Sequence, residues 1–167
     1  VDSQTGKLAQ TEHPKALGSA LTHPHITTDY SEALLEFVTG IHISPQAAIE
    51  ELETLQAFAS SILNQERIWP LSMPCLLPAS DKNIPLAYYG ESHVGRLKTV
   101  YRRGLGFRYG RQMQTIAGVH FNVSFSDSFW TWKAGLEGHS SKLDLRSIRD
   151  AGYFQTIRNF RRIQWLI

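Results

Sequence analysis

The middle of the chain contains a stretch that cannot fold as a regular helix. Four of the seven prolines of the chain lie between residues 69 and 90, at Pro70, Pro74, Pro78 and Pro85. Proline has no backbone N–H, and in a helix interior its ring clashes with the preceding turn. The same stretch contains apolar side chains, among them those of Trp69, Leu71, Met73, Cys75 and Leu76. Long loops are usually functional or disordered, and since this one has side chains to bury, we expect an ordered, irregular connection.

The composition is that of a globular protein. Of the 167 residues, 42% are hydrophobic and 19% are charged, which is typical of neither a disordered nor a fibrous chain. A chain of this length buries about 70% of its unfolded surface, so one domain is expected. The single cysteine, Cys75, excludes an internal disulfide and any metal site built from paired cysteines, and it fits a reducing compartment.

Neither nucleic acid nor a membrane is an expected partner. The net charge of +2 is too small to attract a polyanion strongly. The apolar runs are far shorter than the roughly 18 to 20 residues that a membrane span needs. A basic RNA-binding domain is the weakest interpretation, because the sequence offers no motif for stacking bases.

Four segments have helical patterns. Ser44 and Pro45 form a helix start, because a hydroxyl caps free backbone N–H groups and proline fits the first turn. We expect this helix to run to about Arg67. Its apolar stripe consists of Ile49, Leu52, Leu55, Phe58, Ala59 and Ile62. A basic helix around residues 97–105, a short helix around residues 129–134 and a helix from Leu143 to the end are also predicted.

Two segments have strand patterns, and a third is ambiguous. Residues 26–30 have the composition of a strand. Residues 33–38 fit either a helix or a strand, because periodicity cannot separate the two over so short a run. Residues 119–125 alternate apolar and polar side chains without exception. This pattern predicts a strand with Phe121 and Phe125 on one face and His120 and Asn122 on the other.

Asp29, Glu36 and His120 are candidate metal ligands. The two acids are seven residues apart, which separates them on one flat strand but can bring them together on a hairpin or on two helical turns. Carboxylates are the hard oxygen ligands that suit Mg²⁺. From the residues alone, solvated acids at sheet edges and a histidine that faces water are the alternative.

Positive residues cluster in two stretches, at residues 96–111 and 146–162. Helical spacing spreads these side chains around an axis, so a solvated face is the alternative to phosphate binding. The sequence contains no glycine-rich phosphate loop, and the apolar neighbours of Cys75 give no support for a nucleophilic thiol. A nucleotide site would therefore consist of acids, metal and scattered donors.

Four long strings carry a resemblance that covers essentially the whole chain. They are HPKALGSALTHPHITTDYSEALLEFVTG at residues 13–40, ERIWPLSMPC at residues 66–75, RYGRQMQTIAGVHFNVSF at residues 108–125 and AGYFQTIRNFRRIQWLI at residues 151–167. Together and in this order they resemble the glutamate–cysteine ligases of proteobacterial type, also called γ-glutamylcysteine synthetases. Family members begin upstream with an acidic strand and continue well beyond Ile167. The resemblance thus implies that residues 1–167 form a single partial domain, the N-terminal part of the ligase catalytic domain.

The resemblance implies a fold and an activity. The fold class is α+β, with this chain forming part of a glutamine-synthetase-like antiparallel sheet cradle with packed helices. The implied enzyme is a cytoplasmic, ATP-dependent ligase that phosphorylates the γ-carboxylate of L-glutamate and lets the amine of L-cysteine attack the acyl phosphate. This is the first step of glutathione biosynthesis, with Mg²⁺ or Mn²⁺ as cofactor and ATP as co-substrate. An isolated fragment of this enzyme is expected to be inactive.

The resemblance also implies site residues. Asp29, Glu36 and His120 fall where the family places ligands of Mg²⁺, and His120 also lies at the ATP. No catalytic residue is assigned. The expected cysteine-binding residues are Tyr30, Tyr101, Leu105 and Gln114. Family members often have Phe at the position of Tyr30. The alternative function is that of a non-catalytic remnant or structural fragment that binds a partner chain, such as the missing remainder of the enzyme.

Overall fold

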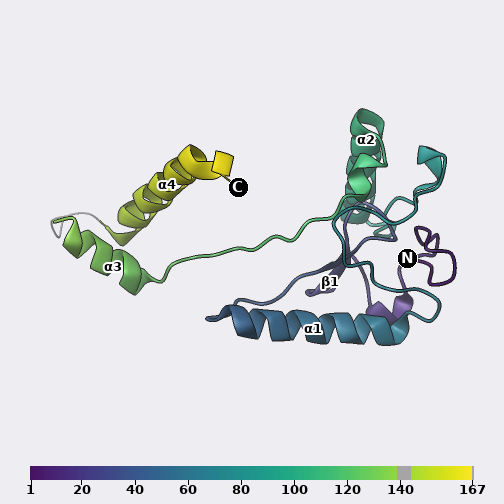
Figure 1. Cartoon of the computed structure of the whole chain (residues 1–167), viewed down its shortest axis with the longest axis horizontal. Coiled ribbons are helices and arrows are strands. Elements are labelled where there is room, and N and C mark those ends of the chain that lie inside the picture. The colour runs from purple at the N-terminus through teal and green to yellow at the C-terminus, as the bar shows by residue number, and fades with distance from the viewer. Residues whose placement is uncertain (139–143, 167) are drawn as a thin grey trace. The chain divides into compact units, whose positions relative to one another are not determined.

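A computed structural model of the chain describes residues 1–138 and 144–166 and divides into two compact units, Val1–Val119 and His120–Ile167 (Figure 1). The first unit contains η1 (Lys15–Leu17), β1 (Ile26–Thr28), β2 (Leu35–Phe37), α1 (Pro45–Ile62), η2 (Asp81–Asn83), α2 (His93–Tyr109) and η3 (Met113–Thr115). The second contains α3 (Asp127–Leu136), α4 (Leu145–Ile163) and η4 (Gln164–Leu166). A small antiparallel sheet combined with four α-helices confirms the α+β class.

Strands β1 and β2 form an antiparallel hairpin. Ile26 is opposite Phe37, Thr27 is opposite Glu36 and Thr28 is opposite Leu35. The strand predicted at residues 26–30 is therefore confirmed for its first part, and the ambiguous run at residues 33–38 contains a strand. Burial alternates along β1, so one face of the hairpin packs on the core and the other is open.

Helix α1 begins as predicted and ends earlier. The hydroxyl of Ser44 accepts a hydrogen bond from the backbone N–H of Ala47 at 3.3 Å, and Pro45 is the first helical residue. The helix ends at Ile62 instead of near Arg67. Beyond the helix, the chain pairs with the N-terminal segment. The hydrogen bonds between these two segments are donated by the backbone N–H groups of Ser3, at 2.9 Å, and of Arg67, at 2.8 Å. Pairing with the N-terminal segment thus replaces the last turn of the expected helix.

The proline-containing stretch is irregular, as predicted, but it buries different side chains from those expected. Trp69, Leu71, Met73 and Leu76 are exposed, and of the expected set Cys75 packs against the core. The buried positions lie further along, at Ile84, Ala87 and Tyr89. Backbone pairing explains the order of this stretch, because the N–H of Leu8 donates to the carbonyl of Leu76 at 2.9 Å and the N–H of Ala87 donates to that of Tyr30 at 3.0 Å.

The core of the first unit consists of three small clusters. Leu17, Ile26 and Ala59 join the hairpin to α1, and the apolar stripe of α1 contributes Leu55 and Ile62. The second cluster contains Leu8, Tyr30 and Ile84. The third contains Ala20, Ala87 and Tyr89. The hairpin is thereby fixed from its packed side, and its open side is left for other contacts.

The second unit contains helices α3 and α4, which confirms the two helices predicted there. The Ser126 hydroxyl caps α3, and the Asp144 carboxylate caps α4 through the N–H of Ser147 at 2.8 Å. Gly152 of α4 is buried against the Trp130 ring, where an added Cβ would clash. Leu143, where the last helix was expected to begin, lies outside the described residues. No helix of the described residues is long and apolar enough to cross a membrane.

The predicted strand at residues 119–125 is wrong. These residues, all of them described, have no strand structure, and Val119 and Phe121 are 91% and 68% exposed. A strand needs a neighbouring backbone to pair with, and residues 1–138 and 144–166 supply none for this segment. Of its apolar side chains, Phe125 packs within the second unit, with its ring 4.5 Å from that of Phe129.

Candidate functional site

The open face of the hairpin carries both predicted acidic ligands. Glu36 shares this face with its partner Thr27. Asp29 follows Thr27 by two residues, and its N–H still pairs with the carbonyl of Leu34 at 3.0 Å, so the alternation extends to Asp29. Both acids are exposed. Of the arrangements that the spacing allowed, the structure therefore has the hairpin, with the two carboxylates on one face.

Tyr89 fixes the end of the hairpin that carries Asp29. It is 4% exposed, and its hydroxyl is shared between the backbone carbonyls of Thr28 at 2.5 Å and Asp29 at 3.0 Å. Burial raises the pKa of Tyr89, and the negative charges of Asp29 and Glu36 raise it further, against the opposite effect of Arg102. The acidic pair and this phenol therefore belong to one electrostatic neighbourhood.

Two cations of α2 cover the ring of Tyr89. The ammonium of Lys98 lies 4.9 Å from the ring centroid, and the guanidinium carbon of Arg102 lies 4.6 Å from it. The Nε–H of Arg102 also donates a hydrogen bond to the backbone carbonyl of Asp29. The sequence showed the positive stretch but not which of its members lie over Tyr89. The spacing of four residues between Lys98 and Arg102 was the available signal.

The acidic pair suits a magnesium ion in its donor chemistry. Mg²⁺ is usually bound by one or two carboxylates together with waters and substrate phosphates. The carboxylates of Asp29 and Glu36 have no hydrogen-bond or ion-pair partner in the part of the chain that the structure describes, so they are free for such a role. Within residues 1–138 and 144–166, however, no three His, Cys, Asp or Glu side chains form a group that could hold a metal.

His120 is the first residue of the second unit and is exposed. It lies in the segment that forms no strand, so the polar strand face expected to line the cradle is not formed there. The structure brings Asp29 and Glu36 together on one face of the hairpin. A role for His120 as third ligand and ATP contact stays a prediction.

The four predicted cysteine-binding residues are only partly brought together. Tyr30 is 2% exposed and packs with Leu8 and Ile84, and Leu105 of α2 packs on the same cluster. Tyr101, one turn before Leu105, is exposed, and Gln114 is half-buried in η3.

The hydroxyl of Tyr30 is buried without a hydrogen-bond partner among the residues that the structure describes. Burial raises its pKa, and the nearby charge of Arg111 acts against that rise. The hydroxyl lies where a Cβ at Gly106 would be, so the glycine leaves room for it. The phenol of Tyr30 is therefore buried against α2 in the interior of the first unit.

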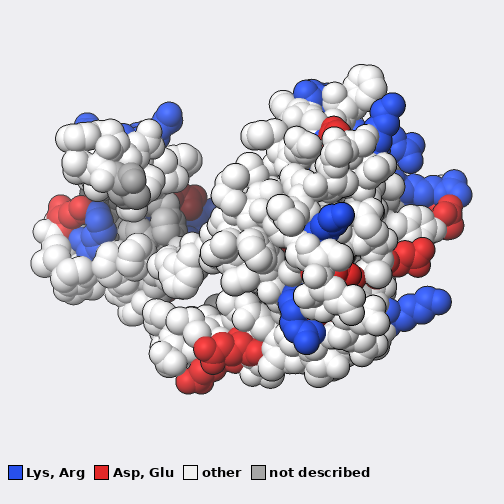
Figure 2. All heavy atoms as spheres, turned by 45° about the vertical axis from the view of Figure 1, so that its right-hand side comes forward, with Lys and Arg blue, Asp and Glu red and all other residues white. Residues whose placement is uncertain are grey.

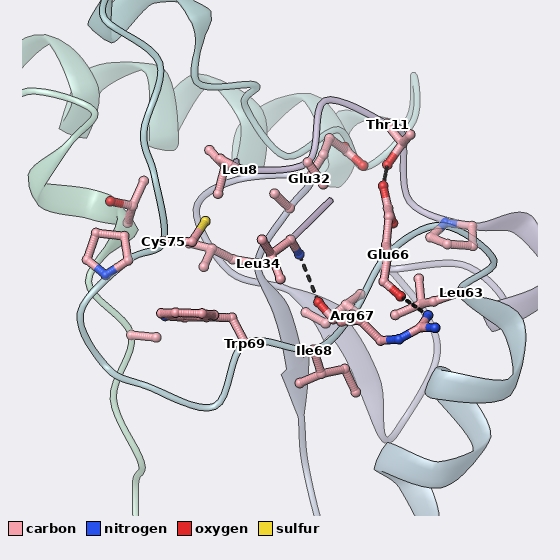
Figure 3. Close-up of a pocket in the computed structure, with 18 of the residues that line it drawn as sticks. Leu8, Thr11, Glu32, Leu34, Leu63, Glu66, Arg67, Ile68, Trp69 and Cys75 are labelled. Carbon is pink, nitrogen blue, oxygen red and sulfur yellow. Dashed lines mark hydrogen bonds between the residues drawn. The ribbon is translucent and has the colours of Figure 1, made fainter. Parts of the chain in front are cut away.

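A separate cavity of about 120 Å³ lies in the first unit (Figure 3). Its wall includes Glu32, Glu66, Arg67, Trp69 and Cys75, and it contains none of the predicted site residues. Two of its carboxylates already have partners. Glu32 accepts a hydrogen bond from the N–H of His13 at 2.7 Å, and Glu66 accepts one from the hydroxyl of Thr11. The cavity thus lies between the N-terminal segment and the proline-containing stretch, and side chains of both line it.

Comparisons with known proteins agree with this structure. The sequence matches the family described as glutamate–cysteine ligase over residues 2–167. The chain is 55% identical to the glutamate–cysteine ligase of Alcanivorax borkumensis over 163 residues, 97% of this chain and 30% of that protein. It is 53% identical to that of Pseudomonas aeruginosa over 167 residues, 100% of this chain and 31% of that protein. The chain thus spans about 30% of the length of the curated relatives it matches.

Solved structures resemble the chain as well. The glutamate–cysteine ligase of Francisella tularensis in complex with AMP superposes with a TM-score of 0.83 at 39% identity, covering 96% of this chain and 30% of that one. A bifunctional glutathione synthetase from Pasteurella multocida superposes with a TM-score of 0.82 at 28% identity, covering 96% and 20%. Fold and matches agree on one class, that of the α+β ligases. More narrowly, the chain belongs to the glutamate–cysteine ligase family, which confirms the resemblance seen in its sequence.

Proposed function

We propose that this chain is part of a cytoplasmic enzyme that uses ATP to join L-glutamate to L-cysteine in the first step of glutathione biosynthesis. The γ-carboxylate oxygen attacks the terminal phosphorus of ATP, and ADP leaves. The amine of cysteine then attacks the acyl carbon, phosphate leaves, and the amine loses a proton. Family membership and the AMP complex of a structural neighbour support this proposal. Its main structural support is the acidic pair on the open face of the hairpin.

In this proposal Asp29 and Glu36 hold Mg²⁺ or Mn²⁺, and His120 completes the site and contacts ATP. Such an ion neutralises charge on the phosphate oxygens during phosphoryl transfer. The hairpin register holds the two carboxylates on one face, and Tyr89 anchors the hairpin end through backbone hydrogen bonds. The protein contribution is therefore the fixed position of the two acids.

The proposal assigns cysteine binding to Tyr30, Tyr101, Leu105 and Gln114. Leu105 packs on the apolar cluster that contains Tyr30, and apolar surroundings suit a small thiol substrate. Tyr101 lies one turn from Leu105 on α2, so both can border the same substrate. Glutamate, cysteine and ATP are then the partners of the enzyme.

A non-catalytic fragment that binds a partner chain is the second candidate function. Two observations favour it. The chain spans about 30% of its relatives, and α4 leaves a row of large apolar side chains exposed. These are Phe154, Ile157, Phe160 and Ile163. Apolar patches of this kind mark interaction sites. Here the partner is the remaining part of the ligase.

The test is a ligase assay on the protein expressed from its whole gene. Formation of γ-glutamylcysteine is measured for the wild type, for Glu36→Gln and for Glu53→Gln, an exposed acid of α1 that serves as the matched control. We expect Glu36→Gln to lower kcat/KM by about 100-fold or more, because misplaced phosphates react slowly, and the control to leave it unchanged. A wild-type protein that forms no product, or full activity of Glu36→Gln, would contradict the proposal.

A further inference from the structure

The cations along α2 and the turn after it differ in their surroundings. They are Arg96, Lys98, Arg102, Arg103, Arg108 and Arg111. On α2, which is described throughout, Lys98 and Arg102 are half-buried and the other arginines are exposed. Arg96 already forms an ion pair with Glu91 at 2.6 Å. Figure 2 shows that Lys and Arg side chains gather on one part of the first unit with Asp and Glu side chains close by. The two half-buried cations are thus distinct from a uniformly solvated face.

Lys98 and Arg102 are held over the same aromatic ring. They are one helical turn apart, and both lie within 5 Å of the centroid of Tyr89. A cation over an aromatic face is stabilised by the ring quadrupole, so the ring orients both charges without neutralising either. Tyr89 itself is fixed to the hairpin by its hydroxyl. The positive charges therefore have a defined position relative to the hairpin end.

Both cations have hydrogen-bond donors without an acceptor among the described residues. Arg102 uses Nε on the carbonyl of Asp29 and Nη1 on the carbonyl of Lys98 at 3.2 Å. Its Nη2 donates to nothing in residues 1–138 and 144–166. The ammonium of Lys98 likewise has no hydrogen-bond or ion-pair acceptor among the described residues. An ammonium has three donors and a guanidinium five, so the pair has donors left for an anion.

The acids nearby do not use these donors. Asp29 and Glu36 lie close enough to Tyr89 to act on its ionisation, yet neither forms an ion pair with Lys98 or Arg102, all four being described residues. Two carboxylates and two cations thus share one neighbourhood with their opposite charges unpaired. A ligand that contains both a metal cation and anionic oxygens would satisfy both sets at once.

We propose that Lys98 and Arg102 bind an anionic group of a substrate beside the acidic pair. This inference rests on the proposed function. The shared chemistry is that of negatively charged oxygens, which occur in the phosphates of ATP and in the carboxylates of the two amino acids. Arg102 positions the hairpin through Asp29 and presents its remaining donors, and Lys98 supplies a charge over the ring.

The kinetic test measures KM separately for ATP, glutamate and cysteine in the protein expressed from its whole gene. The variants are Lys98→Met, which keeps an apolar stem on Tyr89 and removes the charge, Lys98→Arg, which restores the charge, and Arg103→Met as an exposed control on the same helix. We expect Lys98→Met to raise one KM about tenfold or more, because a charge-assisted hydrogen bond is lost. Lys98→Arg should recover most of that loss, and Arg103→Met should change nothing.

The substrate whose KM rises identifies the source of the anion. A rise for ATP alone assigns the pair to a phosphate, and a rise for one amino acid alone assigns it to a carboxylate. Direct titration with Mg²⁺ and a non-hydrolysable ATP analogue, and separately with L-glutamate and L-cysteine, repeats the comparison without turnover. An inactive wild type would contradict the proposed function, and the titrations would still decide the inference. Unchanged affinities and KM values in Lys98→Met, with its fold intact by circular dichroism, would overturn it.

Discussion

The two ends of α2 each bury a tyrosine, but they treat its hydroxyl differently. Near the start of the helix, Tyr89 shares its hydroxyl between two backbone carbonyls and lies among two acids and two cations. Near the end, Tyr30 buries its hydroxyl against Gly106 without a hydrogen-bond partner in the described part of the chain. The same helix therefore borders a charged region around Tyr89 and the apolar core cluster that contains Tyr30.

A glycine of α2 lies at each of these two places, Gly95 near Tyr89 and Gly106 near Tyr30, and the atoms around the two glycines differ. An added Cβ at Gly95 would meet backbone, including the carbonyl oxygen of Gly90 at 2.7 Å. An added Cβ at Gly106 would meet the side chains of Tyr30 and Arg111. Backbone cannot move aside as a side chain can, so the charged end is expected to be the more rigid of the two.

Gly95→Ala is expected to have the largest effect on stability. Because the new methyl group would meet fixed backbone, we expect it to lower the free energy of unfolding by about 3 kcal/mol. Gly104→Ala is the matched control, since nothing lies within 4 Å of its Cβ position. We expect the control to gain about 1 kcal/mol from helix propensity. Urea unfolding of both variants measures the difference, and equal stabilities would contradict the close contact.

Gly106→Ala is expected to have a smaller effect that depends on Tyr30. The new methyl group would displace the phenol oxygen, so we expect a loss of about 1 to 2 kcal/mol. Tyr30→Phe removes that oxygen and should relieve part of the loss in the double variant. A double-mutant cycle of unfolding free energies measures the coupling. A cycle without coupling would mean that the two positions do not touch.

Removing the hydroxyl of each tyrosine should change the stability of the protein differently. Tyr89→Phe loses the bond to the carbonyls of Thr28 and Asp29, and we expect a cost of about 1 kcal/mol. Tyr30→Phe removes a buried polar group without a partner in the described residues, so we expect stability to stay equal or to rise. Thermal unfolding of the two variants measures the order. A larger loss for Tyr30→Phe would reverse the comparison.

Alkaline pH is expected to have the smallest effect on stability, through the two buried phenols. Burial is the largest cause of the raised pKa in Tyr30 and in Tyr89. A raised pKa in the folded state means that the unfolded state loses its proton first, so stability is intact below the ordinary tyrosine pKa of 10.0 and falls as pH rises above it. Unfolding midpoints between pH 8 and 11 should therefore fall less in Tyr89→Phe than in the wild type. An identical fall in both would contradict the buried phenol.

Local signals predicted α1 and the hairpin strand because those elements depend on nearby residues. The cap at Ser44, the proline at position 45 and the apolar stripe act within the helix itself. Residues 119–125 have a cleaner strand pattern than residues 26–30, yet they form no strand, because a strand also needs a partner that the pattern does not contain. Local periodicity thus states what a segment can bury and leaves open what it pairs with.

The candidate site was predictable in part for the same reason. The spacing of Asp29 and Glu36 allowed a shared face on a hairpin or on two helical turns, and the structure has the hairpin. The selection of Lys98 and Arg102 from the six cations depends on where Tyr89 packs, which is a property of tertiary structure. The exposed His120 shows the remaining difficulty, because its role depends on the element that contains it.

Direct measurement of divalent metal binding tests the role of the hairpin face most simply. Mn²⁺ has a paramagnetic resonance signal that reports free ion, so titration of the protein from its whole gene gives an affinity without turnover. We expect Asp29→Asn and Glu36→Gln each to weaken Mn²⁺ binding by about tenfold or more, since each removes one hard carboxylate ligand, and Glu53→Gln to leave it unchanged. Equal Mn²⁺ affinity in the wild type and in both hairpin variants would contradict a metal site on this face.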